Sequence, residues 1–258
     1  MAYKISATVV SNVGKIRQNN EDNYYLFGKY REDTSINISA ANIKCTTEND
    51  VAAVLDGMGG EEAGEVASLL AAAGMASVLD GDWKEQISEQ LIRLNERICA
   101  EMSRQQSGRM GTTFAGIYFD NDKAISANIG DSRCYLMRDK KLQLLSHDHS
   151  EAQSLIDSGS MTEEEARASK KWHVLSQCLG VFPEEFVIVP FFSQVLEVKE
   201  NDRFLICSDG LTDLVLDDEI SDILQASTPE VAAHGLVECA LVKGGYDNVT
   251  VIVADIEQ

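Results

Sequence analysis

Four aspartates stand at the ends of apolar runs typical of buried strands, each with a glycine close by. Asp56 follows Val-Ala-Ala-Val-Leu, Asp131 follows Ala-Asn-Ile-Gly, Asp209 follows Phe-Leu-Ile-Cys-Ser, and Asp247 precedes Asn-Val-Thr-Val-Ile-Val. A single Asp-Gly pair is more often an ordinary turn than a ligand. Four repetitions favour a cluster of carboxylates instead. Because Mg²⁺ and Mn²⁺ prefer oxygen ligands, the pattern predicts a site for hard divalent cations.

Two neighbouring stretches suit the same chemistry. Asp56 is followed by Gly57-Met58-Gly59-Gly60, where few side chains shield the backbone carbonyls from a metal ion. Arg17 precedes the acidic pair Glu21-Asp22, and a guanidinium is a planar, permanently charged group that suits phosphate oxygens. Taken alone, the glycines indicate a strand-to-helix turn and Arg17 a surface ion pair. Beside a cluster of metal-binding carboxylates, Arg17 indicates a phosphoryl substrate.

The composition is that of an ordinary globular protein. The chain has 258 residues, 44% of them hydrophobic and 25% charged, which is enough for one large domain with a core. Lys and Arg number 22 against 42 Asp and Glu, and the net charge of −20 disfavours nucleic acid and anionic membranes as partners. Six scattered cysteines are expected to be reduced thiols. Since no stretch has the length of a signal peptide or membrane span, we expect a cytoplasmic protein.

The elements that must position these residues are short strands and a few longer helices. Runs rich in β-branched residues predict strands at 5–10, 51–55, 112–118, 124–129, 134–138, 187–189, 204–207 and 249–253. Short connections, such as the turn at 120–122, favour antiparallel pairing. Helical patterns cover 62–79, 84–105, 218–226 and 229–241. The sum is α+β, with two segments, 28–50 and 150–171, expected to be excursions from the compact body.

At this point an ordered set of motifs resembles the 2C-type metal-dependent protein phosphatases, also called the PPM family, in its bacterial form. The motifs are R-x-x-N-x-D at Arg17, Asn20 and Asp22, D-G-M-G-G at 56–60, M-G-T-T at 110–113, G-D-S-R at 130–133, D-H-S at 148–150, S-D-G-L at 208–211 and G-G-x-D-N-V-T at 244–250. Each motif alone is weak, whereas the ordered set spans nearly the whole chain and is highly specific.

The resemblance implies a four-layer fold. Two antiparallel β-sheets would stack as a sandwich flanked by pairs of antiparallel α-helices, in a single catalytic domain over residues 1–258. A flap subdomain at about 150–171 would lie beside the active site and contact the substrate protein. The usual ending of that flap, His-Pro followed by Arg, is replaced here by Ser-Lys-Lys-Trp-His at 169–173, which leaves the substrate preference open.

The resemblance also implies the metal ligands for two or three Mn²⁺ or Mg²⁺ ions. They are Asp22, Asp56, the Gly57 carbonyl, Asp131, Asp209 and Asp247. Asp56 would bridge two ions, and Asp131 with help from Asp209 would hold a third. Glu21 stands where some relatives have a further acidic ligand.

The implied activity is hydrolysis of phosphoserine and phosphothreonine in proteins. A hydroxide that bridges the two cations would attack phosphorus directly, and Arg17 would hold the phosphate. Met58 stands where some relatives carry a histidine proposed as the general acid, and His149 is expected to be structural at least as much as catalytic. The substrates would be phosphoproteins of a bacterial Ser/Thr kinase, and the protein a monomer.

Two alternatives remain at this level. One is a pseudophosphatase that binds metal or phosphopeptide without turnover. The other is a metal-dependent nuclease or small-phosphoester hydrolase, which the acidic balance disfavours.

Overall fold

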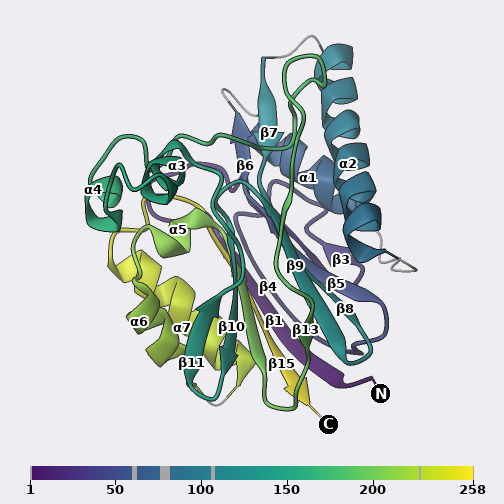
Figure 1. Cartoon of the computed structure of the whole chain (residues 1–258), viewed down its shortest axis with the longest axis vertical. Helices are drawn as coiled ribbons and strands as arrows, with labels where there is room; N and C mark the ends of the chain where they lie inside the picture. Colours follow the sequence, from purple (N-terminus) through teal and green to yellow (C-terminus); the bar gives the residue numbers. More distant parts are fainter. Residues whose placement is uncertain (1, 60–62, 76–81, 106–107, 227, 258) are drawn as a thin grey trace.

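Two antiparallel sheets form the centre of the molecule. The computed structural model describes residues 2–59, 63–75, 82–105, 108–226 and 228–257 (Figure 1). The first sheet has the order β11 (Lys141–Leu144), β10 (Arg133–Arg138), β14 (Arg203–Cys207), β15 (Val249–Glu257), β1 (Lys4–Asn12) and β4 (Ile38–Thr46). The second has the order β12 (Phe191–Phe192), β9 (Lys123–Ile129), β8 (Phe114–Asp120), β5 (Asp50–Leu55), β2 (Asn23–Leu26) and β3 (Lys29–Tyr30), with β13 (Leu196–Glu197) also paired to β9.

Helices cover the outer faces of both sheets. The second sheet packs against α1 (Gly64–Gly74) and α2 (Trp83–Gln105), and the first against α5 (Asp209–Thr212), α6 (Asp217–Ile223) and α7 (Pro229–Val242) (Figure 1). The short strands β6 (Gly57–Gly59) and β7 (Met110–Thr112) pair with each other, while α3 (Glu151–Asp157) and α4 (Glu163–Arg167) lie beside α5 at one end of the sandwich.

The alternation of side chains along β5 shows why four layers form. Val51 and Leu55 point into the core shared with α1 and α2, whereas Ala52 and Val54 point into the core between the sheets. Successive residues of a strand face opposite sides, so a strand that is apolar throughout must be covered on both faces. A third core lies between the first sheet and α5–α7. The predicted α+β sandwich of two antiparallel sheets with flanking helices is confirmed.

The helices follow their sequence signals closely. In α2 the buried residues Ile87, Leu91, Leu94 and Ile98 recur at three- and four-residue intervals and form one apolar stripe. Helix α7 begins at Pro229, directly after Thr228, whose hydroxyl accepts a hydrogen bond from the Val231 N–H. The prediction of a helix over 62–79 is met by α1 between 64 and 74, while residues 62 and 76–79 lie outside the described part of the chain.

Three expectations about strands were wrong. Residues 187–189 form no strand; the Val189 N–H donates to the Gln177 side chain, and Pro190, which has no N–H, precedes β12. The strand predicted over 112–118 is divided at Thr113 between β7 and β8. Segment 28–50 is part of the compact body, because β4 pairs with β1 over its whole length. As an edge strand with alternate residues exposed, β4 carries polar residues that hid it.

The sheets bring distant strand ends together at one end of the sandwich. The pair Asn23 and Leu55 in β2 and β5 places Asp22 next to Asp56. The pair Cys207 and Val251 in β14 and β15 places the chain after β14 next to the chain before β15. Antiparallel pairing therefore gathers carboxylates that are far apart in the sequence. Among the helices in the described ranges, none is both long and apolar enough to cross a lipid bilayer.

Candidate active site

A cavity of about 790 Å³ opens at this end of the sandwich. Of the residues predicted for the site, its lining contains Arg17, Glu21, Asp56, Gly57, Asp131, Asp209 and Asp247. The remaining predicted residue, Asp22, is fully buried and lies next to Asp56 where β2 pairs with β5. The sequence-predicted residues thus come together in one place, and we call the five aspartates Asp22, Asp56, Asp131, Asp209 and Asp247 the carboxylate floor.

Asp56 is fixed by the backbone that follows β5. Its N–H donates to the Thr113 hydroxyl over 3.0 Å, and its carbonyl accepts from the Thr113 N–H over 2.8 Å. Burial raises the pKa of its carboxyl well above the usual value, and the charges of Asp22, Asp209 and Asp131 raise it further. The Asp56 carboxylate is therefore repelled by the carboxylates of the other floor residues.

Asp209 begins the short helix α5 directly after β14. Its Oδ1 atom is buried and has no hydrogen-bond partner among the described residues. Burial and the nearby carboxylates of Asp131 and Asp213 raise its pKa well above the usual value. Burying a carboxylate oxygen without a hydrogen-bond partner costs free energy, which a bound cation would offset. This atom is therefore a candidate cation ligand.

Asp22 has one engaged and one unengaged oxygen. Its Oδ2 accepts a 2.8 Å hydrogen bond from the Ser208 hydroxyl, whereas its Oδ1 is buried with no partner in the described structure. The Arg31 guanidinium donates to the backbone carbonyls of Asn20 and Asp22 and holds this stretch in place. Burial raises the pKa of Asp22 to about 6.

Glu21 faces the cavity next to the glycines of β6 and α1. A Cβ on Gly57 would collide with the backbone carbonyls of Gly64 and Glu21, and a Cβ on Gly64 would collide with the Glu21 carboxylate. Glycine at both positions is thus required for this close approach of backbone and carboxylate. Burial, followed by the charge of Glu65, raises the pKa of Glu21 to about 7.

Arg17 is anchored to the floor by an ion pair. Its Nη2 donates to Asp247 Oδ2 over 2.7 Å, and 54% of its side chain remains exposed. This hydrogen bond is the main cause that raises the pKa of Arg17. Because a guanidinium carries five N–H donors, one bond to Asp247 leaves donors for a phosphate oxygen in the cavity.

Asp131 lies in a turn shaped by His149. Gly130, with a φ of +98°, donates its N–H to His149 Nδ1 over 3.1 Å and accepts from the His149 N–H over 2.9 Å. Burial lowers the pKa of His149, which keeps the ring neutral and able to accept this bond. Burial raises the pKa of Asp131 to about 7. The structural role of His149 follows from these contacts.

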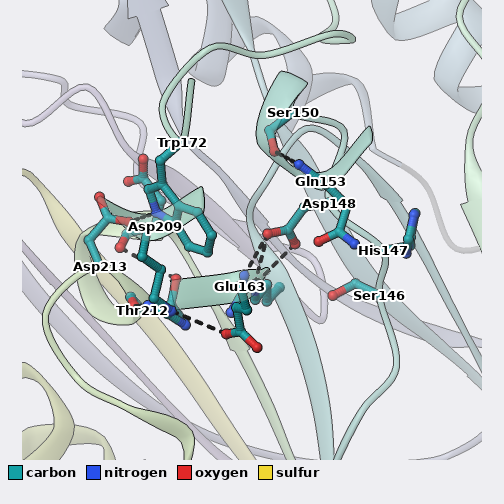
Figure 2. A network of polar contacts seen from close by, with 12 residues as sticks. Ser146, His147, Asp148, Ser150, Gln153, Glu163, Trp172, Asp209, Thr212 and Asp213 are labelled. Atoms are coloured by element: carbon teal, nitrogen blue, oxygen red, sulfur yellow. Dashed lines mark hydrogen bonds and ion pairs between the residues drawn. The ribbon is translucent and has the colours of Figure 1, made fainter. Parts of the chain in front are cut away.

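His173, Asp213 and Trp172 belong to the site but were not predicted to do so. Possible ligand atoms of His173, Asp209 and Asp213 lie within 4.8 Å of one another, and Trp172 donates its indole N–H to Asp213 over 2.8 Å (Figure 2). Asp213 follows Asp209 by four residues, a helical spacing that places both on one side and could have identified it. No sequence signal identified Trp172, because its contact depends on how segment 150–174 folds back.

The donor set fits divalent cations. The floor offers carboxylate oxygens, two of them buried and unpartnered, and the glycines of β6 expose backbone at its edge. Burial raises the pKa values of Asp56 and Asp209, and the charges of the neighbouring carboxylates raise them further. Hard cations such as Mg²⁺ and Mn²⁺ are bound by such oxygens and would remove that repulsion.

Known proteins are similar to this chain in sequence and in fold. A family model described as protein phosphatase 2C matches residues 38–243. The serine/threonine protein phosphatase PstP of Mycobacterium tuberculosis is 37% identical over 95% of this chain, which spans only 44% of that protein. The serine/threonine phosphatase Stp of Listeria welshimeri is 32% identical over 94% of this chain and 92% of its own length.

Solved structures agree with these matches. The crystal structure of the M. tuberculosis PstP phosphatase superposes with a TM-score of 0.84 and 34% identity, covering 99% of this chain and 100% of that one. A second structure, of the PstP catalytic domain in complex with two manganese ions, superposes with a TM-score of 0.80 and 33% identity over the same shares. The motifs at 17–22, 56–60 and 244–250 and these matches show that the chain belongs to the protein phosphatase 2C family.

Proposed function

We propose that this chain is a metal-dependent phosphatase that hydrolyses phosphoserine and phosphothreonine in proteins. The observation that carries the proposal is the convergence of the carboxylate floor and Arg17 in one cavity. Relatives of similar length named serine/threonine phosphatases, and the two manganese ions in the PstP structure, support it.

The floor residues divide between the expected ion positions. Asp56 would be shared by two ions, Asp209 and Asp247 would complete one site, and Asp22 with the Gly57 carbonyl would serve the other. Glu21 lines the cavity beside Gly57 and is a further candidate for that second site. When bound, divalent cations supply Lewis acidity, which activates water and neutralises the charge of the phosphoryl group.

A third ion would be held by Asp131 together with Asp209. The pKa values of both are raised by burial and by neighbouring carboxylates, Asp213 among them, so this part of the floor also lacks compensating charge. Asp213 lies within reach of the same position.

The chain's own residues bind and orient the phosphate. Arg17 is held in place by Asp247, so its remaining N–H groups would meet the nonbridging oxygens without first having to be ordered. Apolar side chains, including Met58, Trp172, Leu175 and Leu214, line part of the cavity and limit its hydration. Met58 cannot donate a proton, so the leaving alkoxide must receive its proton from another group.

The alternative functions are less well supported. A pseudophosphatase would be expected to lack part of the floor, whereas all five aspartates and Arg17 are present. The described lining of the cavity contains six carboxylate residues against the guanidinium groups of Arg17 and Arg167, an arrangement that repels a nucleic-acid backbone.

We infer that the protein acts in the cytoplasm as a monomer, in one catalytic domain, and on phosphoproteins of a bacterial Ser/Thr kinase. Segment 150–171 would contact those substrates, since Arg167 at the end of α4 lines the cavity. The absence of a change in cellular phosphoserine and phosphothreonine on deletion of the gene would contradict this setting.

The direct test is release of phosphate from a phosphothreonine peptide, with Mn²⁺, with Mg²⁺ and with chelator. We expect cation-dependent release that is lost in Asp56→Asn. The matched control is Asp139→Asn, in the exposed turn after β10 at the far end of β14, which should retain full activity. A cation-independent reaction, or no release by protein with bound cations, would contradict the proposal.

A further inference from the structure

Segment 150–174, which we call the flap, contacts the helical turn that carries Asp209. We propose that Trp172 is a positioning residue that fastens the flap to this turn. The contacts of Trp172 are a property of the fold and do not depend on the proposed activity. Only their expected effect on substrates rests on the proposed function. Figure 2 shows the Trp172 indole bonded to Asp213, in the same view as Asp209 and Thr212.

The fastening consists of three contacts. The Trp172 indole N–H donates to Asp213 Oδ1 over 2.8 Å. The guanidinium carbon of Arg167 lies 4.6 Å from the centre of the Trp172 ring, in cation–π geometry. Arg167 Nη1 also donates to the Thr212 carbonyl over 3.3 Å. Two flap side chains thus hold each other and two consecutive residues of the α5 turn.

These contacts reach the carboxylate floor from two sides. The Asp213 N–H donates to the Asp209 carbonyl over 2.8 Å and so closes the helical turn that begins with Asp209. The side chain of the same Asp213 accepts the hydrogen bond from the Trp172 indole. On the other side, the guanidinium of Arg133 lies 5.8 Å from the Trp172 ring. Arg133 is fixed by a buried ion pair with Asp148 at 2.6 Å and follows Asp131 by two residues.

In the described structure the flap has few other contacts with the body: His173 Nδ1 lies 3.3 Å from Asp213 Oδ2, and Asp157 Oδ2 lies 2.8 Å from His147 Nε2. Helices α3 and α4 each bury a single residue, Ala152 and Ala166, and the base of the flap is closed by the isolated bridge between Ser150 and Leu175. Elements with few buried apolar contacts open with low free energy. The three contacts of Trp172 and Arg167, together with the pair of His173 and Asp213, therefore hold the flap against α5.

The fastened flap forms one wall of the cavity. Arg167, Trp172 and Leu175 line the cavity next to Leu214 and Leu216, which follow α5. A peptide extends past the phosphorylated side chain and would meet this wall, whereas a small aryl phosphate fills only the space around the floor. Loss of the fastening should therefore affect peptides more than small esters.

Tryptophan fluorescence tests the fastening without any hydrolysis. The chain has two tryptophans, so Trp83→Phe leaves Trp172 as the only emitter. In this background we expect Arg167→Ala and, separately, Asp213→Ala to shift the emission to longer wavelength and to raise acrylamide quenching about twofold, because the freed indole meets water. Lys170→Ala, an exposed flap residue, is the matched control and should change neither. Unchanged emission in both test variants would overturn the proposal.

Kinetics test the consequence. In Trp172→Phe, which keeps an aromatic ring and removes the N–H donor, we expect the ratio of kcat/KM for a phosphothreonine peptide to that for an aryl phosphate to fall about fivefold, mainly through KM. An equal fall for both substrates, or no fall, would overturn the positioning role. If neither substrate is hydrolysed by the unsubstituted chain, the proposed function fails, while the fluorescence result still decides the fastening.

Discussion

The floor and the flap wall of the cavity are built on opposite principles. The floor residues lie at strand ends, are buried or half-buried, and carry like charges that repel one another. The flap lies on the surface, buries few side chains and is held by hydrogen bonds and cation–π contacts between complementary groups. A rigid sheet can hold like charges together until cations neutralise them, whereas a loosely packed flap can adapt to different peptides. The difference suggests that chemistry and recognition are separated in this molecule.

The largest effect should come from the centre of the floor. Asp56→Asn removes the carboxylate on which the repulsion converges, and we expect kcat to fall at least about 10³-fold, since activation of water depends on the cations that Asp56 holds. The same substitution relieves repulsion, so the metal-free variant should melt about 4 °C above the unsubstituted protein at pH 7.5. Phosphate release and thermal unfolding in chelator measure the two changes. A lower melting temperature in chelator would show that the floor is not under electrostatic strain.

A smaller loss is expected at the boundary between floor and substrate. Arg17→Ala removes the guanidinium paired with Asp247, and kcat/KM should fall about 10²-fold because the phosphate oxygens lose charge-assisted hydrogen bonds. Arg17→Lys, the matched variant, keeps the charge without the planar fork and should lose less. Equal activity of the unsubstituted and Ala forms would mean that Arg17 serves only the ion pair.

A change of pH, which alters stability without removing any side chain, distinguishes the floor from the flap. The pKa values of Glu21, Asp22 and Asp131 are raised to between about 6 and about 7, chiefly by burial, so the folded metal-free state binds protons more tightly than the unfolded chain. The tighter binding of protons therefore adds to the free energy of unfolding. This stabilisation is present in full below the pKa values of the same carboxyls in the unfolded chain, and it is lost as the pH rises through their pKa values in the folded state. The pKa of the flap residue Asp157 is lowered, mainly by its bond to Gln153, so it contributes no change over this range.

Thermal unfolding in chelator should therefore give a melting temperature about 5 °C higher at pH 5.5 than at pH 8. Excess Mn²⁺ should flatten or reverse the trend, because bound cations stabilise the ionised carboxylates. A metal-free protein that becomes more stable as the pH rises would contradict the account of the floor.

The floor was predictable from the sequence, and the resemblance implied a flap beside it, whereas the contacts that hold the flap wall were not predictable, for a physical reason. Asp56, Asp131 and Asp209 each follow a buried strand, and antiparallel pairing determines that such ends meet. The contact between Trp172 and Asp213 depends on the path of a surface segment. The spacing of hydrophobic residues in the sequence does not predict such a path.

The same contrast explains the errors about strands. Val187 and Val189 are β-branched but exposed, only Ile188 between them is buried, and the Val189 N–H donates to the Gln177 side chain and not to a neighbouring strand. Strand β4 was missed because an edge strand with one solvated face need not be apolar. Strand β5, which is buried on both faces, was predicted within one residue of its observed ends.

The most direct test of the central claim is a calorimetric titration of the metal-free protein with Mn²⁺ at pH 7.5, for the unsubstituted chain and for Asp56→Asn. If the floor is a cation centre with Asp56 shared between two ions, the unsubstituted chain should bind at least two ions, and the variant should bind fewer and bind them more weakly. Equal stoichiometry and affinity in both proteins, or no binding to either, would contradict the claim that cations join these strand ends into one site.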